Sequence, residues 1–84
     1  MKANAVLRLK FPSQRHLEII FKALVPEVRK PPTMRSRAFL EKEDTFLILK
    51  IEAKDTVALR ATVNAYLRWI NSIRNVLETL ENVS

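Results

Sequence analysis

The last third of the chain is the feature that most restricts its possible folds. Over residues 55–80 apolar side chains recur every three or four positions, which is the spacing of one helix face. This first stripe consists of Leu59, Val63, Tyr66, Ile70, Ile73, Leu77 and Leu80. A second stripe lies beside it and consists of Ala58, Ala61, Ala65, Trp69, Val76 and Val83. The spacing predicts one helix about 39 Å long, whose first turn the Asp55 carboxylate can cap.

The two stripes together give this helix more apolar surface than one core contact needs. They cover roughly 200° of its circumference, against about 100° for a helix that faces a single core. One possibility is that the surplus binds a partner. The other is that the helix lies between a sheet and a second helix of the same chain. The pattern alone leaves both open.

The first half of the chain predicts a strand, a helix and a loop. Residues 3–11 alternate between apolar and polar, which is typical of a strand with one face on a core. Ser13 is a suitable N-cap for a helix that we expect to end at about Val25, because Pro26 lacks the amide that would continue it. Residues 26–33 hold three of the four prolines and predict a loop.

Residues 34–42 and 45–54 predict a hairpin that turns near Glu43 and Asp44. The order is then β-α-β-β-α, an α+β fold in one domain over residues 1–84. We expect a three-stranded antiparallel sheet with both helices on one face. This layout is similar to that of KH domains, but the GXXG loop that clamps nucleic acid is absent. The other face of the sheet would carry apolar residues that no element of the chain covers, and these are Val6, Phe39, Phe46 and Ile48.

Length and charge limit the function further. A chain of 84 residues forms one small core, so association would stabilise it. Residues 1–42 hold ten Lys or Arg and three Asp or Glu, whereas residues 43–84 hold five and six, so the net charge of +6 lies in the first half. There is no cysteine, no apolar run long enough for a bilayer and no apolar stretch typical of a signal peptide. We expect a soluble, cytoplasmic protein that binds no membrane.

The residue types do not favour catalysis. His16 is the only histidine, and the chain has neither cysteine nor glycine, so it lacks metal-binding spacings and glycine-rich phosphate loops. The acidic residues Glu41, Glu43 and Asp44 are better explained by a turn than by a metal site. We therefore expect no catalytic residue, no metal, no cofactor and no small-molecule substrate.

Basic residues around the proline-rich loop are a candidate binding site. Arg29, Lys30, Arg35 and Arg37 fall within nine residues. Guanidinium groups match phosphate oxygens, which favours a nucleic acid. The same charges are also typical of a solvated loop or of a protected strand edge, and no stacking aromatic residues lie among them. A stand-alone RNA- or DNA-binding module is therefore an alternative function. Further basic residues on the last helix, including Arg60 and Arg68, are better explained as a solvated face.

Three segments carry a family resemblance: FPSQRHLEIIFKALVPE at 11–27, LILKIEAKD at 47–55 and DTVALRATVNAYLRWI at 55–70. Together they resemble the Pcc family, the small dimerising subunit of the KEOPS complex, in its archaeal form. The resemblance extends over about residues 3–80. It implies a non-catalytic scaffold subunit that supports threonylcarbamoylation of the tRNA adenosine next to the anticodon. A separate Kae-type subunit would carry out the catalysis.

The resemblance also implies three surfaces on this chain. The helices would dock the Kae-type subunit, with Ile19, Ala23, Ala58, Ala61, Ala65 and Trp69 as the expected contacts. The sheet would form a homodimer through Val6, Phe39, Phe46 and Ile48. The surface for tRNA, bound as part of the complex, would include Arg29, Lys30, Arg35 and Arg37.

Overall fold

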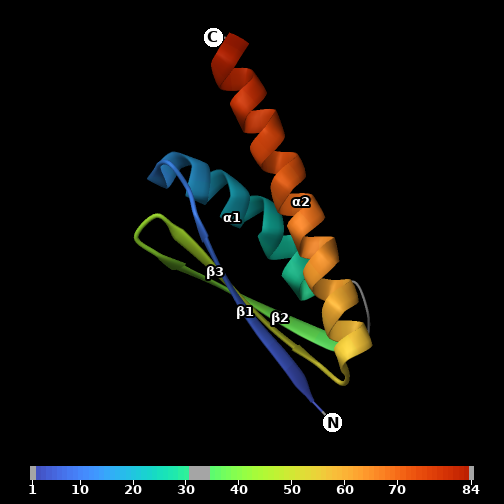
Figure 1. The fold of residues 1–84 in the computed structure, drawn as a ribbon. Coiled ribbons are helices and arrows are strands. Elements are labelled where there is room, and N and C mark those ends of the chain that lie inside the picture. The colour runs from blue at the N-terminus through green and yellow to red at the C-terminus, as the bar shows by residue number, and fades with distance from the viewer. Residues whose placement is uncertain (1, 31–34, 84) are drawn as a thin grey trace.

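The computed structural model describes residues 2–30 and 35–83, with side chains up to Leu80. The elements follow in the order β1 (Ala3–Lys10), α1 (Gln14–Arg29), β2 (Ser36–Glu43), β3 (Phe46–Ala53) and α2 (Thr56–Val83) (Figure 1). The three strands form one antiparallel sheet in the spatial order β1-β3-β2. The predicted β-α-β-β-α order and α+β fold are therefore confirmed.

Both helices lie on one face of the sheet (Figure 1). On the central strand, Leu47, Leu49 and Ile51 point toward the helices and are buried, whereas the Lys50 and Glu52 side chains are exposed on the other face. Since strand side chains alternate between the two faces, this period of two fixes the strand register.

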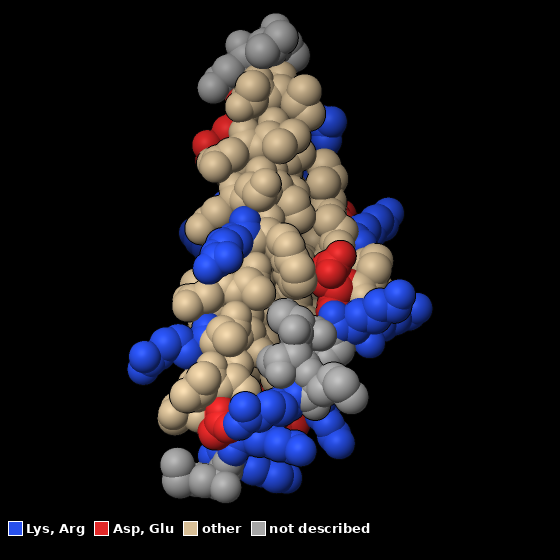
Figure 2. Space-filling view, turned by 90° about the vertical axis from the view of Figure 1, so that its right-hand side faces the viewer, with Lys and Arg blue, Asp and Glu red and all other residues tan. Residues whose placement is uncertain are grey.

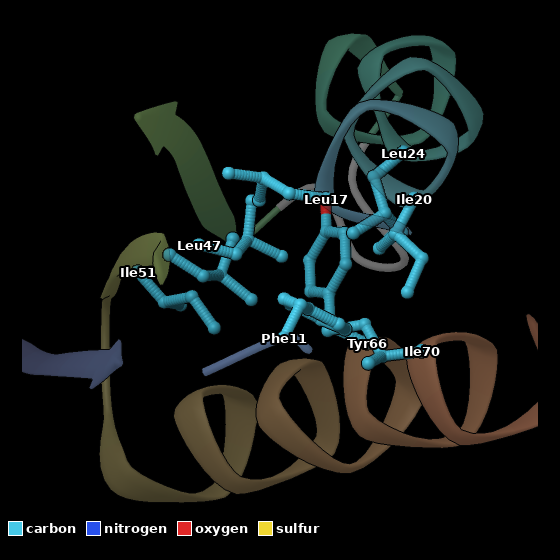
Figure 3. Close-up of a cluster of buried hydrophobic side chains, with 9 residues drawn as sticks. Phe11, Leu17, Ile20, Leu24, Leu47, Ile51, Tyr66 and Ile70 are labelled. Carbon is cyan, nitrogen blue, oxygen red and sulfur yellow. The ribbon is translucent and has the colours of Figure 1, made fainter. Parts of the chain in front are cut away.

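Tyr66 of α2 lies at the centre of the core and is fully buried (Figure 3). Its ring lies among apolar side chains of both helices, and its edge contacts the Trp69 ring at a centroid distance of 5.3 Å. Its hydroxyl donates a hydrogen bond of 3.1 Å to the carbonyl oxygen of Glu27, near the end of α1. Burial, with a smaller contribution from the Glu27 carboxylate, raises the pKa of the Tyr66 phenol to about 12. Tyr66 thus joins the two helices.

Both helices begin at the predicted caps. The Ser13 hydroxyl accepts a hydrogen bond from the backbone amide of His16 at 3.3 Å. The Asp55 carboxylate accepts one from the amide of Ala58 at 2.7 Å. Each cap provides a partner for an amide that the first turn of a helix leaves unbonded.

The predicted end of the first helix at Val25 is wrong, because α1 continues through Pro26 to Arg29. Pro26 and Lys22, one turn earlier, are both exposed, so the carbonyl that loses its amide partner is accessible to water. The last turn is held by Val28, which packs against the core, and by the bond from Tyr66. The rest of the predicted loop, residues 31–33, lies outside the described residues.

The hairpin turns at Asp44, whose φ is 53°. This left-handed conformation normally favours glycine, and aspartate is among the few other residues that adopt it readily. The Gln14 side-chain amide donates a hydrogen bond of 2.7 Å to the Asp44 carbonyl, which ties the turn to the start of α1. In a chain without glycine, Asp44 therefore closes the turn between β2 and β3.

Candidate functional site

The outer face of the sheet, opposite the helices, mixes apolar and charged side chains. Three of its four rows contain apolar residues, and these run in the order β1, β3, β2: Val6–Lys50–Phe39, Arg8–Ile48–Glu41 and Lys10–Phe46–Glu43. In each row an apolar residue has a charged neighbour on the adjacent strand. The four apolar residues predicted for this face are therefore present on it, but they alternate with charged residues.

The charged residues partly cover the apolar ones. Ile48 is only 7% exposed, although it points away from the helices. The guanidinium of Arg8 lies 5.0 Å from the centre of the Phe46 ring. Lys50 and Glu41 form an ion pair of 3.0 Å across β3 and β2. The expectation that nothing in the chain covers Ile48 is therefore wrong.

Two apolar side chains of the outer face remain well exposed. Val6 on β1 is 62% exposed and Phe39 on β2 is 47% exposed. They lie in the same row, on either side of Lys50. Of the four predicted dimer residues, these two offer the most surface to a second molecule.

The predicted docking residues of the helices divide into exposed and buried groups. On α1, Ile19 and Ala23 are exposed. On α2, Ala61 is exposed and both Ala65 and Trp69 are half-buried. Figure 2 shows a largely uncharged strip along the length of the molecule, over α2.

Ala58 differs from the other predicted docking residues because it is only 5% exposed. It lies in the first turn of α2, and its carbonyl accepts a hydrogen bond of 2.8 Å from the buried Thr62 hydroxyl. Ala58 therefore packs within the chain and offers little surface to a partner. Among the apolar residues of α2, Tyr66 and Ile70 are buried in the core and Val76 is exposed, so the helix uses part of its surplus apolar surface internally and leaves part of it free.

The predicted basic cluster lies at two places. Arg29 and Lys30 are at the end of α1, whereas Arg35 and Arg37 are at the start of β2. Arg35 forms an ion pair with Asp55, the cap of α2. Arg35 and Arg37 also line an open hollow of about 240 Å³ at the end of the sheet.

Sequence reasoning missed two basic residues of this hollow, Lys2 and Lys54. Lys2 immediately precedes β1 and Lys54 immediately follows β3. Because β1 and β3 are antiparallel, the start of one lies beside the end of the other. The sequence contains a lysine one residue outside each of these strands, but only the pairing of β1 with β3 shows that the two lysines lie close together.

Metal-binding and membrane-spanning features are absent from the described part of the chain. Within residues 2–30 and 35–83, no three His, Asp or Glu side chains are placed to hold a metal ion. No helix of these residues is long and apolar enough to cross a membrane.

The arrangement of strands and helices is matched by known proteins. A family model described as "Transcription factor Pcc1" matches residues 4–80. The chain belongs to the Pcc1 family. It is 39% identical over 69 residues to the KEOPS complex subunit Pcc1 of Pyrococcus abyssi (strain GE5 / Orsay), which covers 82% of this chain and 84% of that protein. The predicted family is therefore confirmed.

The Pcc1 fold is also found among solved structures. A chain in the crystal structure of the binary Gon7–Pcc1 complex superposes with a TM-score of 0.81, covering 93% of this chain and 95% of that one. The sequences are 20% identical, so this similarity supports the fold alone.

Proposed function

We propose that this protein is a non-catalytic scaffold subunit of a cytoplasmic KEOPS complex that modifies tRNA. It forms a homodimer, docks a Kae-type catalytic subunit through its helices and supports tRNA binding for threonylcarbamoylation of the adenosine next to the anticodon. The observation that carries the proposal is the 39% identity to a KEOPS complex subunit over most of both chains.

The exposed apolar residues of α1 and α2 support the docking part of the proposal. Ala23 and Ala61 are small and exposed, so a helix of the partner can approach closely at these positions. Ile19 and the half-buried Trp69 supply larger apolar contacts, of the kind that dominate binding energy at interfaces. Ala58 lies beneath this surface and supports it from inside the chain.

A charge placed on the docking surface tests this part. In the Ala61→Glu variant, a carboxylate replaces an exposed methyl group, and we expect the affinity for the Kae-type subunit to fall at least tenfold, or about 1.4 kcal/mol. Asn71→Glu is the matched control, because Asn71 is exposed on the polar side of the same helix, about 15 Å further along it, and the substitution adds the same charge. Isothermal titration calorimetry measures both. Equal affinity of Ala61→Glu and the unchanged protein would remove α2 from the docking surface.

The outer face of the sheet supports the dimer part. Val6 and Phe39 offer exposed apolar surface in one row, with Phe46 and Ile48 beneath the charged side chains beside them. Lys50 and Glu41 already pair within one molecule, so a second copy does not leave either charge without a partner.

A double variant tests the dimer. We expect Val6→Ser with Phe39→Ser to give the mass of a monomer in light scattering at concentrations where the unchanged protein gives a dimer. Val57→Ser is the control, because Val57 is an apolar residue on α2 that is even more exposed than Val6 or Phe39. A dimer that survives the double substitution would show that the molecules associate elsewhere.

A further inference from the structure

The open hollow at the end of the sheet lies where β1 and β2 begin and β3 ends. Figure 2 shows Lys and Arg side chains gathered at this lower end of the molecule. The residues that line the hollow are Lys2, Arg35, Ser36, Arg37, Glu52, Ala53 and Lys54. Four of these seven side chains are cationic and one is acidic.

Small residues lie between the long cationic ones. Ser36 of β2 and Ala53 of β3 are opposite each other in the strand pairing, and both are buried. The hydroxyls of Ser36 and of Thr62 on α2 are hydrogen-bonded at 2.9 Å, with Ser36 donating because the Thr62 proton goes to the Ala58 carbonyl, so helix and strand are joined at this point. Because strand side chains alternate, Ser36 and Ala53 point toward the helices, so neither fills the space between the cationic side chains.

The strand alternation places the cations on one side. The Lys54 amide donates a hydrogen bond of 3.0 Å to the Arg35 carbonyl, so the pairing of β3 and β2 continues one step past the strand ends. Lys2, Lys54 and Arg35 are each two residues from Asn4, Glu52 and Arg37, which form a row of the outer face. With a period of two, they continue the outer face by one further row.

Most of these cations lack a carboxylate partner. Among the described residues, Lys2, Arg37 and Lys54 form no ion pair, whereas Arg8 and Lys50 on the same face pair with Glu43 and Glu41. Arg35 pairs with Asp55. Glu52 lines the hollow and Asp55 pairs with Arg35 beside it, so two carboxylates stand against four cations, which leaves a local excess of two positive charges.

We propose that this hollow binds a backbone phosphate of RNA, with Arg37, Lys2 and Lys54 as the principal contacts and Arg35 beside them. A guanidinium offers paired donors that match phosphate oxygens, and two ammonium groups add positive charge beside it. No large apolar side chain lines the hollow, so it has no group that would insert into a lipid layer or anchor a protein. The inference rests on the proposed function for tRNA as the RNA, and it adds Lys2 and Lys54 to the predicted residues Arg35 and Arg37.

The test is the salt dependence of tRNA binding to the full-length chain. Each phosphate contact adds about 0.9 to the steepness with which log K falls against log salt for a duplex, so a variant that lacks one contact loses about eightfold less affinity than the unchanged protein for each tenfold rise in salt. We expect Lys54→Gln and Arg37→Gln each to lower the slope by about this amount. Arg60→Gln and Arg68→Gln are matched controls, because they remove the same charge from exposed positions of α2. We expect them to leave the slope unchanged.

An opposite change makes the test independent of folding defects. Glu52→Gln removes the acidic side chain of the hollow, and we expect it to tighten tRNA binding severalfold relative to the unchanged protein. The α2 controls should keep the affinity and the slope of the unchanged protein. Thermal melting by circular dichroism verifies that each variant is folded. Equal slopes for Lys54→Gln, Arg37→Gln and the α2 controls would overturn the proposal, as would weaker binding by Glu52→Gln.

Two further measurements distinguish an RNA site from a site for free phosphate and separate the hollow from the scaffold role. Inorganic phosphate is titrated while backbone amide signals of residues 35–37 and 52–54 are followed by nuclear magnetic resonance. Phosphate-induced shifts of these signals, together with unchanged tRNA slopes for the Lys54→Gln and Arg37→Gln variants, would mean a site for free phosphate and would overturn the RNA assignment. Binding of the same variants to the Kae-type subunit tests the proposed function separately. If the variants bind the Kae-type subunit normally and keep the tRNA slope of the unchanged protein, only the RNA site in the hollow is refuted. If the unchanged protein does not bind the Kae-type subunit, only the scaffold role is refuted.

Discussion

Replacing Tyr66 by phenylalanine tests the joint between the two helices. The ring and its packing remain, and only the hydroxyl that donates to the Glu27 carbonyl at 3.1 Å is removed. That carbonyl also accepts a hydrogen bond from the Lys30 amide at 3.2 Å, so the substitution does not leave it bare. One net hydrogen bond contributes about 1 kcal/mol to the free energy of unfolding. For a chain of this size, we expect the melting temperature to fall by about 4–8 °C.

The same hydroxyl predicts a specific pH dependence. The pKa of Tyr66 is raised from 10.0 to about 12 by burial and by the Glu27 carboxylate. Above pH 10 the unfolded chain loses this proton while the folded chain keeps it, so the folded state binds more protons and stability falls as pH rises. This contribution is complete below pH 10 and is lost as the pH rises toward 12. The phenylalanine variant lacks it.

Urea unfolding at about pH 8 and about pH 11, followed by far-ultraviolet circular dichroism at one protein concentration, measures the effect. Lysines titrate in both proteins, so their contribution cancels in the difference between them. We expect the variant to be less stable at about pH 8, and the difference to narrow or reverse at about pH 11. Tyr66 is the only tyrosine, so tyrosinate absorbance reports its titration directly. A stability difference that stays constant with pH, or a native titration near pH 10, would refute the reasoning.

Three other substitutions test features of the fold by thermal or urea unfolding. Asp55→Ala removes the acceptor for the Ala58 amide at 2.7 Å, and we expect a loss of about 1–2 kcal/mol, whereas Asp55→Asn keeps most of it. Pro26→Ala restores the missing amide within α1, and we expect a gain of about 1 kcal/mol; a loss would show that the turn depends on proline. Arg74→Gln removes the hydrogen bond of 2.7 Å to the Lys10 carbonyl, and we expect a loss of about 1 kcal/mol that Arg74→Lys restores only in part.

The strands and their faces followed from the sequence because alternation is a local signal. Leu47, Leu49 and Ile51 on one side and Phe46 and Ile48 on the other are placed by the period of two alone. The helix caps at Ser13 and Asp55 followed for the same reason, since a cap acts within one turn. Local chemistry was sufficient for these elements.

The errors concern positions where distant parts of the chain decide. Proline disfavours a helix interior, but Tyr66 holds the turn that follows Pro26 through its hydrogen bond to Glu27, which lies 39 residues before it. Ile48 was expected to be bare, but it is only 7% exposed, and Arg8 and Glu41 are its partners on the neighbouring strands on either side. Neither contact is visible as a pattern along the sequence, because each joins residues that only the tertiary fold brings together.

The exposure of residues on the candidate surfaces could also be predicted only where local periodicity determines it. The exposed positions Ile19, Ala23 and Ala61 follow from helix periodicity. The burial of Ala58 depends on how the first turn of α2 lies on the sheet, which periodicity does not specify. Lys2 and Lys54 joined the basic hollow only once the strand pairing was known.

Among the described residues, contacts of three cations with aromatic rings fix where part of the positive charge of this protein lies. Arg74 lies 4.4 Å from the centre of the Phe11 ring, Lys42 lies 4.7 Å from that of Phe21, and Arg8 lies over Phe46. Together with the ion pairs, these contacts hold much of the positive charge close to the protein surface and to its own partners. The electrostatic potential that an approaching polyanion meets is therefore steeper at one pole than the net charge of +6 suggests. A nucleic acid diffusing toward the protein would be oriented before contact, and it would meet first the pole of the protein at which α2 begins.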